Sequence, residues 1–238
     1  MLEILKNRTY RHLFLAQVVA LLGTGLATVA LSLLAFDLAG DKAGQVVGTA
    51  MAIKMVAYVF IAPIAAALAE NIPRRVMLVS LDLVRAAVAL ALPFVTEVWE
   101  VYVLIAVLQS ASAAFTPTFQ STIPDTLPNE DDYTRALSLS RLAYDLENLI
   151  SPALAGMLLL VTSWQGLFSG TVVGFIASAL LVVSVALPSG SAPEKRRGIY
   201  ERSRRGFRIF MATPRLRGLI ALNVVVSMAG SMVIVNTV

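Results

Sequence analysis

The stretch LFLAQVVALLGTGLATVALSLLAF, residues 13–36, contains no charged side chain. A helix of about 20 apolar residues is long enough to cross the hydrocarbon core of a bilayer. The residues before it are basic, as in a secretory signal peptide, but the apolar part of a signal peptide is only about 7–15 residues long. We therefore predict a first membrane span that is retained at the N-terminus.

The composition of the whole chain agrees with a membrane protein. Of its 238 residues, 58% are hydrophobic and 14% are charged, whereas a soluble domain has about 45–50% apolar and about 25% charged residues. There is no Cys, and His12 is the single His, so a disulfide framework and Cys- or His-based metal clusters are excluded. We predict an all-α, polytopic membrane helix bundle without metal or cofactor.

Apolar runs of similar length recur along the chain, and short polar breaks separate them. We predict spans over residues 13–38, 45–69, 76–96, 99–124, 137–162 and 165–187, and a seventh over 218–238. The chain then divides into a six-helix bundle (1–190), a basic linker (191–217) and the start of a second bundle (218–238). Within the linker, residues 199–211 alternate Arg with aromatic and aliphatic side chains, which predicts an amphipathic helix at the cytoplasmic lipid surface.

The distribution of basic residues predicts the orientation. Of the 19 Lys and Arg residues, all but Lys42, Lys54 and Arg85 fall on one side: at the N-terminus, in alternate breaks or, for Arg141, just inside the next predicted span. The positive-inside rule makes that side cytoplasmic. We expect a multi-pass protein of the cell (plasma or inner) membrane with a cytoplasmic N-terminus. The high isoelectric point is thereby explained without nucleic acid.

Ionisable residues within membrane spans are rare and mark functional sites by default. The candidates within the predicted spans are Asp37, Lys54, Asp82, Arg85, Arg141, Asp145 and Glu147. Some have a structural explanation as well. Asp37 lies near the outer end of its span, where interfacial water can solvate it, and Asp82 and Arg85 are three positions apart, so they can neutralise each other. Lys54 is about 15 Å into its span, so we expect it to face an internal cavity or a carboxylate on another helix.

The stretch AYDLENLISPALAG, residues 143–156, contains two of these acids. Asp145 and Glu147 are about 200° apart on a helix, so one can face a cavity while the other meets water or a neighbouring helix. Asp145 shares its face with Arg141 and can pair with it. A low-dielectric site disfavours the charged form of a carboxylate, which suits proton exchange near neutral pH. We expect Asp145→Asn to impair proton coupling more than Asp82→Asn does.

Other motifs argue against enzymes and pumps. The sequence has no H-E-x-x-H zinc motif and no Gly-rich phosphate loop, so we predict that the protein is neither an enzyme nor an ATP-driven pump. The GxxxG spacings at Gly44–Gly48 and Gly166–Gly170–Gly174 are typical of close helix packing in membranes.

Three stretches resemble the major facilitator superfamily. AALAENIPRR (66–75) is similar to the family's loop motif G-x-L-A-D-R-x-G-R-R, with Arg74 and Arg75 conserved in position and Glu70 in place of Asp. ENLISPALAG (147–156) resembles the exporter-associated motif G-x-x-x-G-P-x-x-G-G: Pro152 and Gly156 match, and Ser151 replaces a glycine. GFRIFMATPRLRGLIAL (206–222) resembles the linker before the seventh span in the macrolide and siderophore exporter-like branch. The basic residue that some exporters have in span four is absent here.

This resemblance implies a six-helix N-terminal bundle of inverted three-helix repeats that works with a second bundle, in the same gene or another chain, by alternating access. It implies proton-coupled export of an amphipathic small molecule, drug-like or siderophore-like. Glu70, Arg74 and Arg75 would latch a cytoplasmic gate, with Asp82 and Arg85 near it. The proton-coupling and cavity set would be Asp145, Glu147, Lys54 and Asp37, and Ser151, Pro152 and Gly156 would line the interface between the halves. The alternative is a truncated or half-length chain that does not transport by itself and serves as partner or scaffold for another bundle.

Overall fold

The computed structural model describes residues 2–68 and 72–187, together with the isolated positions 208, 212, 213, 218, 222 and 225. The chain divides into two units, Met1–Ser191 and Ala192–Val238, and the fold described below is that of the first unit. Most of the predicted amphipathic helix at 199–211 and of the predicted seventh span lies outside the described residues. Glu70 lies outside them as well.

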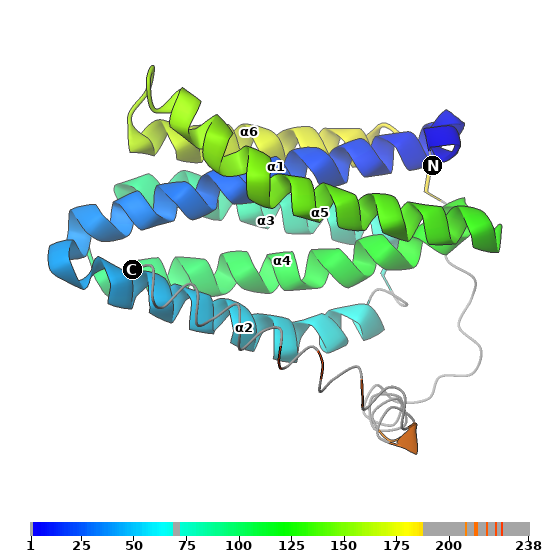
Figure 1. The fold of residues 1–238 in the computed structure, drawn as a ribbon, viewed down its shortest axis with the longest axis horizontal. Coiled ribbons are helices and arrows are strands. Elements are labelled where there is room, and N and C mark those ends of the chain that lie inside the picture. Colours follow the sequence, from blue (N-terminus) through cyan, green and yellow to red (C-terminus); the bar gives the residue numbers. More distant parts are fainter. Residues whose placement is uncertain are drawn as a thin grey trace. The chain divides into compact units, whose positions relative to one another are not determined.

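The described part of the first unit is helical throughout, as the sequence predicts (Figure 1). Its long helices run nearly side by side, and short 3-10 turns extend or join some of them. The long helices are α1 (Arg8–Ala39), α2 (Ala43–Leu68), α3 (Arg74–Ala91), α4 (Val98–Thr126), α5 (Glu130–Leu158) and α6 (Trp164–Val183). The 3-10 turns are η1 (Leu2–Lys6), η2 (Gly40–Lys42) and η3 (Leu92–Phe94).

The break between α4 and α5 is shorter than the sequence suggests. Residues 124–135 are polar and contain prolines, but α4 continues to Thr126 and α5 begins at Glu130. The side chain of Asn129 caps α5 by accepting a hydrogen bond from the backbone N–H of Asp131, and three acidic residues follow in the first turn. Negative charge at a helix N-terminus is stabilising. For this reason the acidic residues that the sequence analysis assigned to the break form the first turn of α5 instead.

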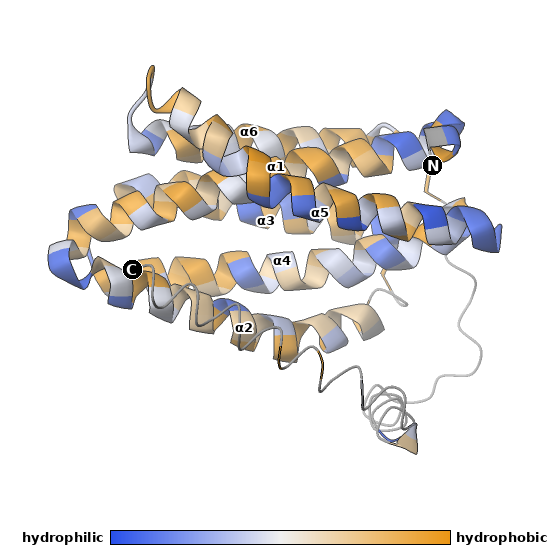
Figure 2. Ribbon diagram, viewed as in Figure 1, coloured by the Kyte–Doolittle hydropathy of each residue, from blue (hydrophilic) through white to orange (hydrophobic). Residues whose placement is uncertain are grey.

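Four stretches of the described residues are long and apolar enough to cross a membrane: Arg8–Ala66, which contains both α1 and α2, and then Arg74–Phe94, Val98–Thr126 and Trp164–Val183. The helix α5 is not among them, because its charged and polar side chains lower its hydropathy. Figure 2 shows apolar residues along most of the helices, with hydrophilic ones near the N-terminus, at the α1–α2 turn, at the start of α5 and also in the middle of α5. Large apolar side chains point outward from several helices, including Val59, Phe60, Leu149 and Leu180, as expected of a lipid-facing surface.

The helices pack in a defined set of neighbours. The helix α1 lies against α6 and α5, α2 lies against α4, and α3 lies against α6 and α4. One apolar cluster surrounds Leu34, Leu92 and Phe168, and another surrounds Tyr10 and Phe119. Between them, at mid-length of α1 and α4, the interior is polar.

Candidate functional site

A cavity of about 330 Å³ opens between the helices at this level. Four helices supply most of its wall, and α3 adds one residue, Arg85. The lining side chains with polar groups are Gln17, Thr24 and Thr28 of α1, Lys54 and Tyr58 of α2, Ser112 and Thr116 of α4, and Tyr144, Glu147, Asn148 and Ser151 of α5. A polar cavity inside an apolar helix bundle is a site that water or a polar ligand can occupy.

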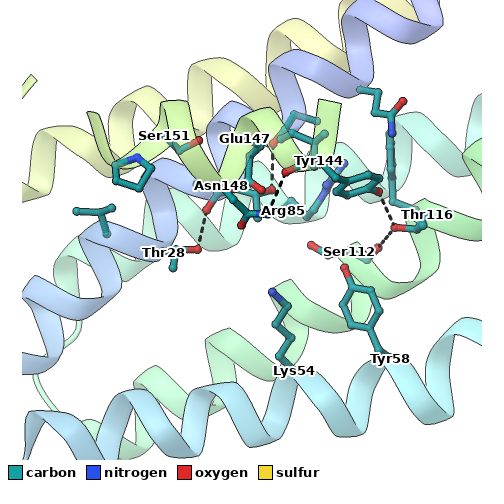
Figure 3. Close-up of a pocket in the computed structure, with 18 of the residues that line it drawn as sticks. Thr28, Lys54, Tyr58, Arg85, Ser112, Thr116, Tyr144, Glu147, Asn148 and Ser151 are labelled. Carbon is teal, nitrogen blue, oxygen red and sulfur yellow. Dashed lines mark hydrogen bonds between the residues drawn. The ribbon is translucent and has the colours of Figure 1, made fainter. Parts of the chain in front are cut away.

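Lys54 and Glu147 bring opposite charges to this cavity. In Figure 3, Lys54 and Tyr58 extend from α2 on one side, while Tyr144, Glu147 and Asn148 belong to α5 on the other. The ammonium of Lys54 and the carboxylate of Glu147 interact electrostatically. No ion pair shorter than 4.0 Å in the described part of the chain includes either of them. Both charges are therefore available to a ligand.

Asp145 lies outside the cavity. It forms a 3.4 Å ion pair with Arg141, and the two side chains are 58% and 79% exposed, respectively. The reason is the helical period, since two positions turn a side chain by about 200° and Glu147 takes the inward direction. Of Asp145 and Glu147, it is therefore Glu147 whose carboxylate lines the cavity.

Asp37 also lies away from the cavity. It is exposed near the end of α1, three positions before the turn at Gly40. Its place is that of an interfacial residue, where water can solvate the charge.

Asp82 and Arg85 form an ion pair deep in the bundle. Asp82 is fully buried, and its carboxylate also accepts a 2.7 Å hydrogen bond from the hydroxyl of Ser178 on α6. The Arg85 guanidinium lies between two aromatic rings, 4.2 Å from the centroid of Phe115 and 4.5 Å from that of Phe175. Cation–π contacts of this kind are strongest where water is excluded. The pair thus joins α3 to α4 and α6, and it leaves Arg85 at the cavity wall.

Asp82 and Arg85 lie away from the arginines at the start of α3. They are 8 and 11 positions along α3 from Arg74, which corresponds to at least about 12 Å of helix. At the start of α3, Arg74 pairs with Asp125 and donates to the carbonyl of Ser121 near the end of α4. Arg75 donates to the carbonyl of Val183 at the end of α6. Two arginines therefore tie three helix ends together, and the buried pair is a separate feature.

The motif residues of α5 occupy different surroundings. Ser151 is buried against α1, where a methyl group added to Gly25 would overlap its side chain and approach the Glu147 carboxylate. Pro152 is exposed and borders the cavity. Gly156 is exposed, with open space where a side chain would start. Within the first unit, Ser151 therefore belongs to the α1–α5 contact.

Several cavity residues were not singled out from the sequence, among them Tyr144 and Asn148 of α5. With Glu147 and Ser151, which the sequence analysis does name, they recur at intervals of three, one and three positions, which places the four on one helical face. The sequence alone therefore contains this pattern of polar residues on one face of the helix. Gln17, Thr24 and Thr28 form a similar stripe on α1, and the Tyr144 hydroxyl lies 3.3 Å from that of Thr116 across the α4–α5 contact. In the residues described, no group of three or more His, Cys, Asp or Glu side chains is arranged to hold a metal ion.

Apolar helices around a charged, polar cavity are typical of a polytopic membrane protein. Residues 13–238 match the family model of the Major Facilitator Superfamily. Over 162 residues the chain is 24% identical to the "Uncharacterized MFS-type transporter YfiS" of Bacillus subtilis (strain 168). That alignment covers 66% of this chain and 39% of the relative, so the chain spans about two fifths of the relative's length.

The chain belongs to the major facilitator superfamily, and it is a multi-pass membrane protein. The family match points to a transporter rather than to an enzyme. The predictions of an all-α fold and of a multi-pass membrane protein are thereby confirmed. The linker helix and the seventh span stay predictions.

Proposed function

We propose that the chain forms the N-terminal half of a secondary active transporter that exports an amphipathic small molecule in exchange for protons. The observation that carries the proposal is the cavity with Lys54 and Glu147 on facing helices. An ammonium and a carboxylate that share a water-reachable site inside apolar helices serve no evident packing purpose, because ionisable groups there are tolerated mainly for function.

Glu147 is the proton carrier in this proposal. It takes a proton when the cavity opens to the outside and releases it when the cavity opens to the cytoplasm. Each change alters the charge that faces Lys54 and the ligand, so ligand affinity changes with protonation. Coupling requires such a difference in affinity between two states. Protonated Glu147 favours release of a ligand that its carboxylate had bound.

Alternating access requires a second bundle and a gate. We place the gate at the helix ends tied by Arg74 and Arg75, together with Glu70 in the α2–α3 connection. The Arg75 contact is exposed, so water can compete for it, whereas the Arg74–Asp125 pair is partly buried. A gate must open in each cycle, and the exposed contact is the one that water loosens first. We place the N-terminus in the cytoplasm and the protein in the cell membrane.

The test measures proton movement in proteoliposomes that contain the purified full transporter, in which this chain is joined or paired with its second bundle, and a pH-sensitive dye. We expect at least one member of a panel of cationic, anionic and zwitterionic amphiphiles to drive proton flux. Glu147→Gln abolishes the flux, and Asp145→Asn, two positions along the same helix, retains it. Flux that is equal in the wild type and in Glu147→Gln contradicts the proposal. Loss in Asp145→Asn alone would instead favour the acid that the sequence first suggested.

A further inference from the structure

The charges at the cavity wall sum to zero, and this restricts the ligand. Arg85 is already neutralised, because its guanidinium pairs with Asp82 on the same helix. Among the described residues that line the cavity, the other two with a formal charge at neutral pH are Lys54 and Glu147. They face the same space from α2 and α5 without a direct ion pair in the described residues.

A ligand with a net charge cannot satisfy both groups. A cation pairs with Glu147 and adds its charge to that of Lys54, while an anion does the reverse. In a site of low dielectric, an uncompensated charge costs several kcal/mol. A molecule with one group of each sign pairs with both and leaves the cavity neutral, so the wall selects against singly charged ligands.

Two buried polar atoms at the wall lack partners. Neither Nε of Arg85 nor Oγ of Ser151 makes a hydrogen bond to any residue that the structure describes. Both side chains are more than nine-tenths buried, at 3% and 1% exposure, respectively, and both residues line the cavity. Buried polar groups are nearly always hydrogen-bonded in native proteins. Protein encloses both atoms, Ser151 against Gly25 and Arg85 between two aromatic rings, so a ligand in the cavity would meet Lys54 and Glu147 rather than these two atoms.

Beside its charged and polar side chains, the cavity wall also has apolar surface. Leu21 and Val29 of α1, Met51 of α2, Phe115 of α4 and Pro152 of α5 contribute hydrocarbon or aromatic surface. We propose that the cavity binds an amphipathic zwitterion, with its anionic group at Lys54, its cationic group at Glu147 and its apolar body against these side chains. The proposal rests on the function proposed above, since it takes this cavity as the substrate site.

Three matched probes test the charge requirement: tryptophan, which is a zwitterion, tryptophanamide, which is a cation, and N-acetyltryptophan, which is an anion. Equilibrium binding of each radiolabelled probe is measured on the purified protein in detergent. We expect tryptophan to bind at least about tenfold more tightly than either of the others, because it gains one more charge-assisted hydrogen bond. Lys54→Met removes its advantage over the amide, and Glu147→Gln removes its advantage over the N-acetyl compound.

The matched control variants are Lys42→Met and Asp41→Asn, which remove the same charges from the α1–α2 turn outside the cavity. They keep the wild-type order of affinities. Equal affinity for the three probes, no saturable binding of any probe, or an unchanged order in Lys54→Met overturns the proposal. Zwitterion selectivity without any proton flux would leave this inference standing and would contradict the transport function. Proton flux driven by a simple cation, without zwitterion selectivity, would do the opposite.

Discussion

At the scale of single residues, the Asp82–Arg85 pair is the most buried ionic feature in the described part of the molecule. Asp82 is fully buried, and two aromatic rings and Ser178 enclose the pair. Removing one partner of a buried ion pair typically costs about 3–5 kcal/mol, because the other charge is left uncompensated. We expect Asp82→Ala to lower the free energy of unfolding by about that amount, as measured by thermal unfolding of the purified protein.

Replacing both partners separates the value of the pair from the cost of a single charge. Asp82→Leu combined with Arg85→Met fills the site with apolar side chains, and we expect stability to return close to that of the wild type. Arg141→Gln is the control, because it breaks a pair whose side chains are mostly exposed and changes stability by at most about 1 kcal/mol. An effect of Asp82→Ala as small as that of Arg141→Gln would show that the buried charge finds another partner.

The residues of α5 show what sequence can and cannot predict at this scale. The spacing of Asp145 and Glu147 shows that they point in different directions, but it does not say which direction is inward. That choice depends on how α5 is rotated against α1, and the contact of Gly25 with Ser151 and the 3.0 Å hydrogen bond between Ser140 and Gln17 fix this rotation. Both contacts join residues more than a hundred positions apart, so no local pattern contains them.

At the scale of helices, glycines set how closely α1 approaches its neighbours. Gly23 of α1 lies against Gly174 of α6, where the backbones come close enough that an added methyl group on Gly174 would be 3.1 Å from the Val19 carbonyl oxygen. Thr171 strengthens the contact by donating a 3.0 Å hydrogen bond to the carbonyl of Gly23. Small residues of this kind allow van der Waals packing between membrane helices.

Gly25 gives a direct test of the α1–α5 contact. A methyl group at this position overlaps Ser151 and approaches Glu147. Overpacking of a close contact costs about 1–3 kcal/mol, so we expect Gly25→Ala to lower the thermal stability and to push α5 away from α1. Gly48→Ala is the control, because nothing lies within 4 Å of a methyl group there. Measuring both variants by thermal unfolding compares the same chemical change at a crowded and an open position.

A second substitution shows whether overlap is the cause. Adding Ser151→Gly to Gly25→Ala exchanges the small residue between the two helices and removes the main clash. We expect the double variant to recover much of the lost stability. If it is no more stable than Gly25→Ala alone, a different contact limits how closely these helices approach.

The GxxxG spacings predicted the helix contacts only in part. Gly174 meets the α1 backbone and Gly170 lies near Leu26, which confirms the predicted packing for this pair. Gly166 instead lies under the side chain of Thr162, and Gly48 faces open space. The spacing identifies a smooth helix face, but the arrangement of the other helices decides whether a neighbour covers it.

At the scale of the whole molecule, the path of α5 through the bilayer decides where the cavity lies. By length and hydropathy, four stretches of the described residues can cross a membrane, Arg8–Ala66, Arg74–Phe94, Val98–Thr126 and Trp164–Val183, and α5 is not among them. Yet Gly25, Gln17 and Thr116 contact it along the cavity from the apolar helices α1 and α4. A polar helix is stable at membrane depth when its polar face lines a cavity and its apolar face meets lipid, and Leu146 and Leu149 are exposed on the outer side.

The absence of Cys from the sequence makes a labelling test of this path direct. Single cysteines are introduced as Asp41→Cys in the α1–α2 turn, Asp131→Cys at the start of α5 and Ser163→Cys before α6, all at exposed positions. With the cytoplasmic N-terminus proposed here, a membrane-impermeant thiol reagent labels intact cells at positions 41 and 163 but reaches position 131 only after permeabilisation. The last two positions lie at opposite ends of α5, so labelling of both from the same side would place this helix outside the bilayer. The cavity carboxylate would then lie in ordinary water, and the physical reason for assigning proton coupling to Glu147 would be lost.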